Sequence, residues 1–290
     1  MEKGNEQIVL EIKTLKLPNA EYEKHVTLYR DTGAGCRGCI LYFHGGGLLY
    51  GRREDLPEGH INTLTRAGYL LAAFDYPLAP AARIDRILAD VCASISGFQQ
   101  LKPGWDRLPL FLWGRSAGAY LCLLAAAKGN LPVPNGILSY YGYGLLCDGW
   151  FTAPSAYYRR LPAVPATCLD RLPEVCHGDG SLDTHYSAYV YARQTGCWMD
   201  LIYEGKPKLF YLNHTLRVCD SLPCPLFCAH STHDPDVPYE EFLALSERFH
   251  PQRFIVPGDT HDFDRDAGSP FTAQLLEATV DFLTKHTSSG

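Results

Sequence analysis

Short apolar runs that end in glycine alternate with helix-like stretches, and this alternation constrains the fold more than any other feature of the sequence. The run RGCILYFHGGG (residues 37–47) is almost continuously apolar before its glycines, residues 108–114 repeat the pattern, and residues 69–76 form a similar run without a final glycine. Such runs are typical of strands buried on both faces. Between them, apolar side chains recur at helical spacing in residues 84–95. The sequence therefore predicts an α/β fold, with a parallel sheet covered by helices.

The alternation is interrupted between Leu145 and Lys208, where prolines and tyrosines are frequent and no strand pattern is visible. Long segments without regular structure are uncommon in compact domains and usually serve a function. The regular pattern then resumes and continues through the last predicted helix. We therefore predict an α/β core formed by residues 1–144 and 209–290, with a mostly helical cap, or lid, formed by residues 145–208.

Composition and charge exclude several classes of protein. The chain has 290 residues, 46% of them hydrophobic, and a formal net charge of −6. Its mild acidity, with no run of lysine and arginine along a predicted helix, argues against a nucleic-acid partner. We find no signal-peptide pattern at the charged N-terminus and no apolar run long enough to span a membrane, so we expect a cytoplasmic protein. The sequence leaves the oligomeric state open, and a homodimer is compatible with it.

The cysteines do not indicate a metal or redox site. There are 11 of them, scattered along the chain, and without a secretory signal we expect them to be reduced. Cys36 and Cys39 form one CxxC motif, but it lacks the second pair of a typical zinc site and does not open a helix. We expect no metal and no cofactor.

The sequence GRSAG, residues 114–118, follows one of the buried runs directly and precedes a helical pattern. Glycines on both sides of Ser116 allow the strand and the helix to approach closely. A sharp turn of this kind lifts the serine hydroxyl clear of the sheet and places the Ala117 N–H at a helix N-terminus. Because a plain turn does not need this arrangement, the motif predicts a nucleophilic serine.

A serine nucleophile needs a histidine base, and the histidine needs an acid that fixes its tautomer. In strand–GxSxG–helix folds these residues follow in the order serine, acid, histidine. Two loops after later predicted strands supply candidates, HSTHDPDVP (residues 230–238) and GDTHDF (residues 258–263). Asp234 and His261 are the natural pair in these loops.

Other residues in these loops are weaker candidates. Asp236 lies two residues beyond Asp234 and farther from the strand end, so we predict that Asp234 rather than Asp236 contacts the histidine. His230 and His233 precede the acid, which breaks the expected order. As metal ligands together with Asp234, they would lack a distant partner at a recognisable spacing.

A second glycine-rich turn follows the buried run that ends at Phe43. The residues after it are His44 and then three glycines, which allow backbone N–H groups to turn inward without obstruction by side chains. An acyl carbonyl that is attacked by serine becomes an oxyanion, and backbone N–H donors of this kind stabilise it. Alone, the stretch would equally suit a flexible turn. Together with the serine motif, it predicts an oxyanion hole.

Five motifs, FHGGG, FDYPLAP, GRSAG, DPDVP and GDTHDF, occur in that order between Gly38 and His261. Together they resemble the signatures of the hormone-sensitive lipase-like branch of the α/β-hydrolase family. The resemblance implies a serine-acid-histidine triad and an oxyanion hole. The residues that it implies for these roles are Ser116 as nucleophile, Asp234 as acid and His261 as base, with the N–H groups of Gly46, Gly47 and Ala117 as oxyanion donors.

The chain also departs from that branch. Arg115 occupies a position that is usually acidic, and Pro77 replaces an arginine. The N-terminus is too short for the usual N-terminal cap, which leaves the insertion as the predicted lid. We predict that its large side chains contact the substrate; the candidates are Tyr189, Arg193 and Trp198. The alternative is that these rings form only the insertion's own core, as aromatic stripes usually do.

The motifs favour a serine hydrolase that cleaves small-molecule carboxylic esters through an acyl-enzyme on Ser116, as carboxylesterases and acetylesterases do. Esters have better leaving groups than amides. An amidase or small-peptide hydrolase that uses the same triad is the first alternative. A binding protein that keeps the fold without catalysis is the second, and an intact triad in the expected order argues against it.

Overall fold

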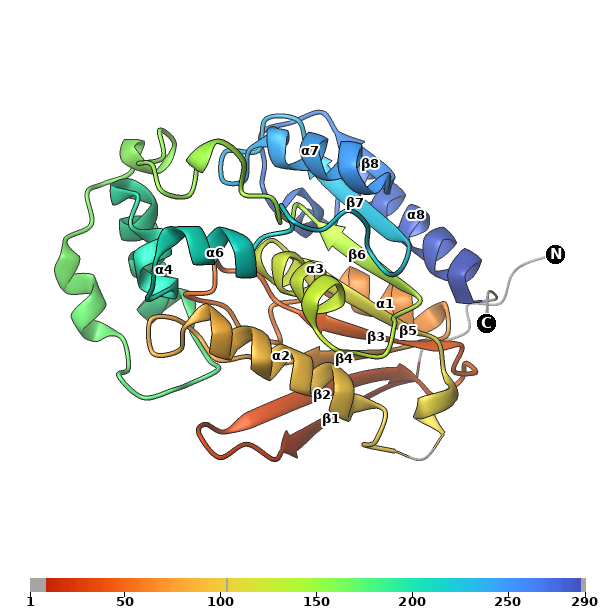
Figure 1. Ribbon diagram of the computed structural model, residues 1–290. Helices are drawn as coiled ribbons and strands as arrows, with labels where there is room; N and C mark the ends of the chain where they lie inside the picture. The colour runs from red at the N-terminus through yellow and green to blue at the C-terminus, as the bar shows by residue number, and fades with distance from the viewer. Residues whose placement is uncertain (1–8, 103, 288–290) are drawn as a thin grey trace.

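A computed structural model describes residues 9–102 and 104–287 of the chain. Its described strands form one eight-stranded sheet in the order β1-β2-β4-β3-β5-β6-β7-β8 (Figure 1). Strand β2 runs antiparallel to both of its neighbours, and the remaining pairs are parallel. The strands are β1 (Leu10–Leu17), β2 (Lys24–Asp31), β3 (Gly38–Phe43), β4 (Tyr69–Phe74), β5 (Leu110–Arg115), β6 (Gly136–Tyr140), β7 (Leu226–Ser231) and β8 (Gln252–Val256).

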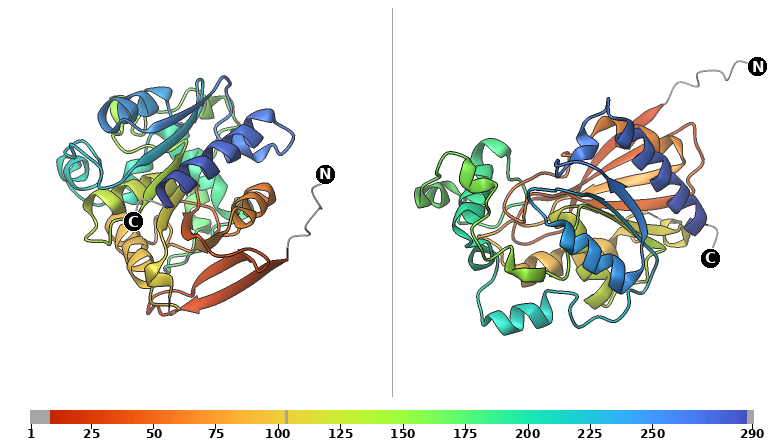
Figure 2. Two further views of the ribbon diagram at one scale, coloured as in Figure 1. Left: turned by 90° about the vertical axis from the view of Figure 1, so that its right-hand side faces the viewer. Right: turned by 90° about the horizontal axis from the view of Figure 1, so that it is seen from above.

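Helices cover both faces of the sheet (Figures 1 and 2). Three of them, α2, α3 and α7, contribute to the hydrophobic cluster on one face, and α1 and α8 contribute to the cluster on the other face. The helices of the core are α1 (Glu58–Arg66), α2 (Ile84–Phe98), α3 (Ala117–Lys128), α6 (Pro207–Asn213), α7 (Tyr239–Phe249) and α8 (Pro270–Thr287).

The burial of each element follows from its sequence pattern. Every residue of the central strands β3, β4 and β5 is buried, as continuous apolar runs predict. Helix α3 is apolar on nearly all sides and is buried along most of its length, whereas α2 buries only one stripe of side chains. The predicted α/β fold with a mostly parallel sheet is confirmed.

Residues 145–208 contain no strand of the sheet, and all of them are described. They form loops, 3-10 turns and two α-helices, α4 (Leu182–Thr195) and α5 (Trp198–Ile202). This segment gathers at one end of the sheet, on the left in Figure 1 and in the right-hand view of Figure 2. The parallel strands end on that side, so the segment lies where the loops after β3, β5 and β7 emerge.

Candidate active site

The backbone around Ser116 has the strained geometry that the glycine-flanked motif predicts. Ser116 lies between β5 and α3 with φ +52° and ψ −118°, a conformation that few residues other than glycine adopt. A Cβ on Gly114 would lie 2.2 Å from the backbone of Gly118, and a Cβ on Gly118 would lie 2.0 Å from the Phe43 carbonyl oxygen. Only glycine allows the strand and the helix to pack this closely.

The structure brings the three predicted triad residues together. Ser116 Oγ lies 3.0 Å from His261 Nε2, and His261 Nδ1 lies 2.6 Å from Asp234 Oδ2. The other carboxylate oxygen of Asp234 accepts the backbone N–H groups of Asp236 and Val237, at 2.8 and 3.0 Å. These bonds fix the carboxylate, which in turn orients the imidazole toward the serine.

The electrostatics of the site favour a charged His261–Asp234 pair. Burial lowers the pKa of His261, but Asp234, Asp236 and Asp262 raise it, and the net effect is a pKa of about 9. Burial raises the pKa of Asp234, yet the neighbouring imidazole lowers it further, so that it lies below its usual value. An imidazole that gains its proton from the serine is therefore strongly stabilised by this environment.

The glycine-rich turn after β3 passes directly beside the serine. A Cβ on Gly45 would lie 3.3 Å from Ser116 Cβ. Gly46 and Gly47 have φ of +104° and +58°, and a Cβ on Gly46 would lie 1.9 Å from the Tyr50 carbonyl oxygen. The turn thus requires glycine twice. The loop also lies against the first turn of α3, which begins at Ala117, since a Cβ on Gly118 would lie 2.5 Å from the His44 carbonyl oxygen.

The three residues predicted in the cap are buried, and they contact loops of the core. Trp198 Nε1 donates to the carbonyl oxygen of Gly47 at 2.7 Å. The Tyr189 hydroxyl donates to the carboxylate of Asp236, and Arg193 Nη2 donates to the Asp236 carbonyl oxygen at 2.9 Å. Each of these side chains thus bonds to a residue outside residues 145–208.

Asp236 lies closer to the reacting groups than its position in the sequence suggests. Asp234 bonds to His261 Nδ1, but the carboxylate of Asp236 reaches the other side of the ring, with Oδ2 at 3.8 Å from Nε2. The sequence DPD, residues 234–236, does indicate that both carboxylates lie near the same group. Asp234 and Asp236 lie two residues apart in one tight loop, so both carboxylates can reach the same imidazole.

A buried cluster beneath the serine was not predicted from the sequence. Arg115 Nη2 donates to Asp264 Oδ1 at 2.9 Å, and the Tyr141 hydroxyl donates to the same oxygen at 2.8 Å. His60 Nε2 lies 2.9 Å from the second oxygen of Asp264. The only signal in the sequence was an arginine at the end of a fully buried strand, because such a charge needs a buried partner.

The two other histidines of the Asp234 loop contact oxygen atoms of neighbouring residues. His230 Nε2 contacts the carbonyl oxygen of Val237 at 3.0 Å, and His233 Nδ1 lies 2.9 Å from the Thr232 hydroxyl. Among residues 9–102 and 104–287, no group of histidine, cysteine, aspartate or glutamate side chains is arranged to hold a metal ion. All 11 cysteines are unpaired.

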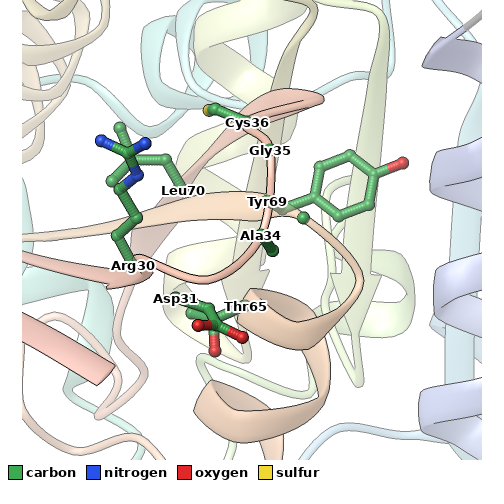
Figure 3. A pocket seen from close by; sticks show the side chains of 9 residues that line it. Arg30, Asp31, Ala34, Gly35, Cys36, Thr65, Tyr69 and Leu70 are labelled. Atoms are coloured by element: carbon green, nitrogen blue, oxygen red, sulfur yellow. The ribbon is translucent and has the colours of Figure 1, made fainter. Parts of the chain in front are cut away.

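Figure 3 shows a small pocket that includes Cys36 of the CxxC motif together with Arg30, Asp31 and Tyr69. It lies where β3 and β4 begin, whereas Ser116 lies where the parallel strands end. The pocket is therefore at the opposite end of the sheet from the triad.

Comparisons with known proteins identify the family. A family model described as "alpha/beta hydrolase fold" matches residues 40–197, more than half of the chain, so the chain belongs to this family. This match confirms the resemblance that the sequence motifs indicated. No curated protein matches the chain in sequence.

Solved structures agree with this assignment. A Staphylococcus aureus protein described as of unknown function is 28% identical, with a TM-score of 0.82, and the match covers 95% of this chain and 99% of that one. An α/β-hydrolase superfamily protein from Enterococcus faecalis is 26% identical, with a TM-score of 0.80 and the same coverage. A structure titled as an arylesterase shares the fold, with 18% identity, a TM-score of 0.69 and coverage of 96% of this chain and 86% of that one.

None of the helices in the described part of the chain is both long enough and apolar enough to cross a membrane.

Proposed function

We propose that the protein is a serine hydrolase that cleaves small carboxylic esters through an acyl-enzyme on Ser116. The observation that carries the proposal is the continuous chain from Ser116 Oγ through His261 to Asp234, with distances of 3.0 and 2.6 Å. Structures titled as an arylesterase and as a hormone-sensitive lipase share the fold, which supports an ester as the substrate.

The proposed reaction begins when Ser116 Oγ attacks the acyl carbonyl and His261 Nε2 takes its proton. Asp234 stabilises the imidazolium that results. The backbone N–H groups of Gly46, Gly47 and Ala117 are the proposed donors to the oxyanion, and one such donor typically lowers the barrier by about 3–4 kcal/mol. The imidazolium then protonates the leaving alcohol. In the second half of the reaction, water attacks the acyl-enzyme and regenerates Ser116.

We further propose that residues 145–208 act as a cap over this site, with residues 1–144 and 209–290 as the core. The contacts of Tyr189, Arg193 and Trp198 with core loops support this division, because they connect α4 and α5 to the oxyanion turn and to the Asp236 loop. Tyrosine and tryptophan offer large apolar faces with polar edges, which suits a partly wet pocket wall. The cap would therefore set the size of the acyl or alcohol group.

The test of the proposed function compares Ser116→Ala with Ser221→Ala, which changes an exposed serine on a surface loop. Loss of the nucleophile should reduce turnover of p-nitrophenyl acetate by about 10⁴- to 10⁶-fold, while the control retains full activity. Intact-mass analysis after treatment with a fluorophosphonate should show one adduct, on Ser116, in the wild type and in the control. Thermal unfolding checks that both variants are folded.

Four outcomes would contradict the proposal. Undiminished turnover in Ser116→Ala, or an adduct on another residue, would remove Ser116 as the nucleophile. Faster cleavage of a matched anilide than of the ester would make the protein an amidase. No turnover of any ester or anilide by the wild-type protein would favour a binding protein that keeps the fold without catalysis.

A further inference from the structure

We propose that Asp236 positions the water molecule that hydrolyses the acyl-enzyme, together with His261. This inference rests on the proposed function, because it concerns the second half of that reaction. It assigns a task to a carboxylate that lies outside the Ser116–His261–Asp234 chain.

The geometry around His261 Nε2 carries the proposal. Nδ1 of this ring is occupied by Asp234, so Nε2 is the nitrogen that exchanges protons. Two side-chain oxygens face it, Ser116 Oγ at 3.0 Å and Asp236 Oδ2 at 3.8 Å. A water molecule that gives a proton to Nε2 must lie within hydrogen-bond distance of that nitrogen, and hence beside the Asp236 carboxylate.

The Asp236 carboxylate is fixed in place and can still accept a hydrogen bond. The Tyr189 hydroxyl lies 2.7 and 2.9 Å from its two oxygens. Arg193 bonds to the backbone carbonyl of Asp236, while its Nε lies 3.4 Å from Oδ1 and has no hydrogen-bond partner. A carboxylate offers about four acceptor positions, so these contacts leave Oδ2 able to accept another donor.

The chemistry of deacylation needs such an acceptor. As the water oxygen forms a bond to the acyl carbon, one of its protons passes to His261 Nε2. The second proton stays on the attacking oxygen and is donated to Asp236 as a hydrogen bond. The tetrahedral intermediate then collapses, the bond to Ser116 Oγ breaks, and His261 returns its proton to that oxygen. The free acid retains the hydroxyl proton that faced Asp236.

Acylation by an ester does not use this contact. The leaving alcohol of an ester carries a carbon substituent where water carries its second proton, so it cannot make the same hydrogen bond as it departs. Asp236 should therefore act mainly on hydrolysis of the acyl-enzyme. Methanol makes the same distinction, since it can give one proton to His261 but has a methyl group in place of the other.

The experiment measures how the acetyl-enzyme, formed from p-nitrophenyl acetate, divides between water and a fixed concentration of methanol. In Asp236→Asn, the ratio of methyl acetate to acetate should rise about tenfold, because a hydrogen bond from water to a charged group is lost and methanol never made it. A burst of p-nitrophenol should precede the slower steady state. Above the pH at which His261 is neutral in both proteins, inactivation by a small fluorophosphonate should keep its wild-type rate within about twofold, since it requires only Ser116 and His261.

Asp262→Asn is the matched control. Its carboxylate also acts on His261 electrostatically, but it is 42% exposed and pairs with Arg265. The product ratio of this variant should equal that of the wild type. Tyr189→Phe removes only the hydroxyl that holds Asp236, and its ratio should rise less than that of Asp236→Asn. If Asp236→Asn does not fold, the product ratio of Tyr189→Phe tests the proposal instead.

The outcomes separate this inference from the proposed function. If the wild type forms no acetyl adduct on Ser116, the proposed function fails and the inference with it. If the adduct forms but the product ratio is unchanged in Asp236→Asn, or in Tyr189→Phe where the first variant is unfolded, Asp236 does not position the water. Equal losses of hydrolysis, methanolysis and phosphonate reactivity would likewise overturn it, because they would indicate a structural role.

Discussion

Two buried clusters with the same composition, one arginine, one aspartate and one tyrosine each, flank the Ser116–His261 pair. Arg115, Tyr141 and Asp264 form the Arg115 cluster; Tyr189, Arg193 and Asp236 form the Arg193 cluster. The first joins three segments of the core, those at the ends of β5 and β6 and after β8. The second joins helix α4 to the loop after β7.

In the Arg115 cluster, the arginine donates a hydrogen bond directly to the carboxylate. Both Arg115 and Tyr141 donate to one carboxylate oxygen of Asp264, Arg115 also donates to the Tyr141 hydroxyl, and His60 lies against the second oxygen. Burial alone would raise the pKa of Asp264, but Arg115 and His60 hold it well below its usual value. The cluster ties the residue before the nucleophile to the loop that carries His261.

The Arg193 cluster is only partly bonded. Its carboxylate accepts hydrogen bonds from Tyr189, whereas Arg193 forms an ion pair with it at 3.4 Å without a hydrogen bond. Asp236 Oδ2 lies 3.8 Å from His261 Nε2. The difference suggests a division of labour. A carboxylate that its arginine holds by a hydrogen bond ties segments together, whereas one that faces the catalytic imidazole can take part in a reaction.

The largest effect that this comparison predicts is on stability. Arg115→Met keeps the apolar stem but leaves Asp264 charged and without its arginine at a site that is almost fully buried. Breaking a buried ion pair in this way typically costs about 3–5 kcal/mol, so the free energy of unfolding in urea should fall by about that amount. Arg107→Met, at an exposed arginine, should change it by less than about 0.5 kcal/mol.

The loss of stability in Arg115→Met should become smaller at low pH. The folded-state pKa of Asp264 is lowered, so the stability that it contributes is present above the unfolded-state pKa of about 4 and is lost as the pH falls. The difference in the free energy of unfolding between the wild type and Arg115→Met should therefore narrow as the pH falls from about 5 toward 3. A gap that stays constant would show that the variant acts through packing rather than through the ion pair.

The second prediction is a smaller loss of stability at the other arginine. Arg193→Met removes one hydrogen bond to a backbone carbonyl and a guanidinium that lies 4.8 Å from the centre of the Trp150 ring. The ion pair that is lost here is longer, at 3.4 Å, and contains no hydrogen bond, so we expect a smaller cost of about 1–3 kcal/mol in the same urea experiment. A cost equal to that of Arg115→Met would mean that the two clusters do not differ in the way described here.

These clusters also mark the limit of what the sequence could predict. The strand and helix pattern, and the order of Ser116, Asp234 and His261, follow from local periodicity and from loops at strand ends. Tyr189 and Arg193 are one helical turn apart, so their common face was predictable as well. The long-range contacts were not predictable. Arg115 and Asp264 lie 149 residues apart in the sequence, and Trp198 lies 151 residues from Gly47, whose carbonyl it contacts. Such contacts depend on the paths of loops, which side-chain periodicity does not encode.

The smallest predicted effect is on the pH dependence of acylation. His261 must be neutral to accept the proton of Ser116, and its pKa is about 9, so kcat/KM should rise with pH up to that region. The charged groups that raise this pKa are Asp234, Asp236 and Asp262. Asp236→Asn and Asp262→Asn each remove one negative charge, so both should move the rising limb to lower pH.

The comparison between these two variants makes the prediction specific. If the Asp236 carboxylate acted only through its charge, the two variants would behave alike in every assay. We expect them to share the shift of the pH profile, measured as kcat/KM for p-nitrophenyl acetate, while only Asp236→Asn changes the division of the acetyl-enzyme between water and methanol. If the rising limb of the pH profile does not move in Asp236→Asn, the Asp236 carboxylate does not face the imidazole in solution. That result would break the contrast between the clusters, since the Arg193 cluster would then also serve only the fold.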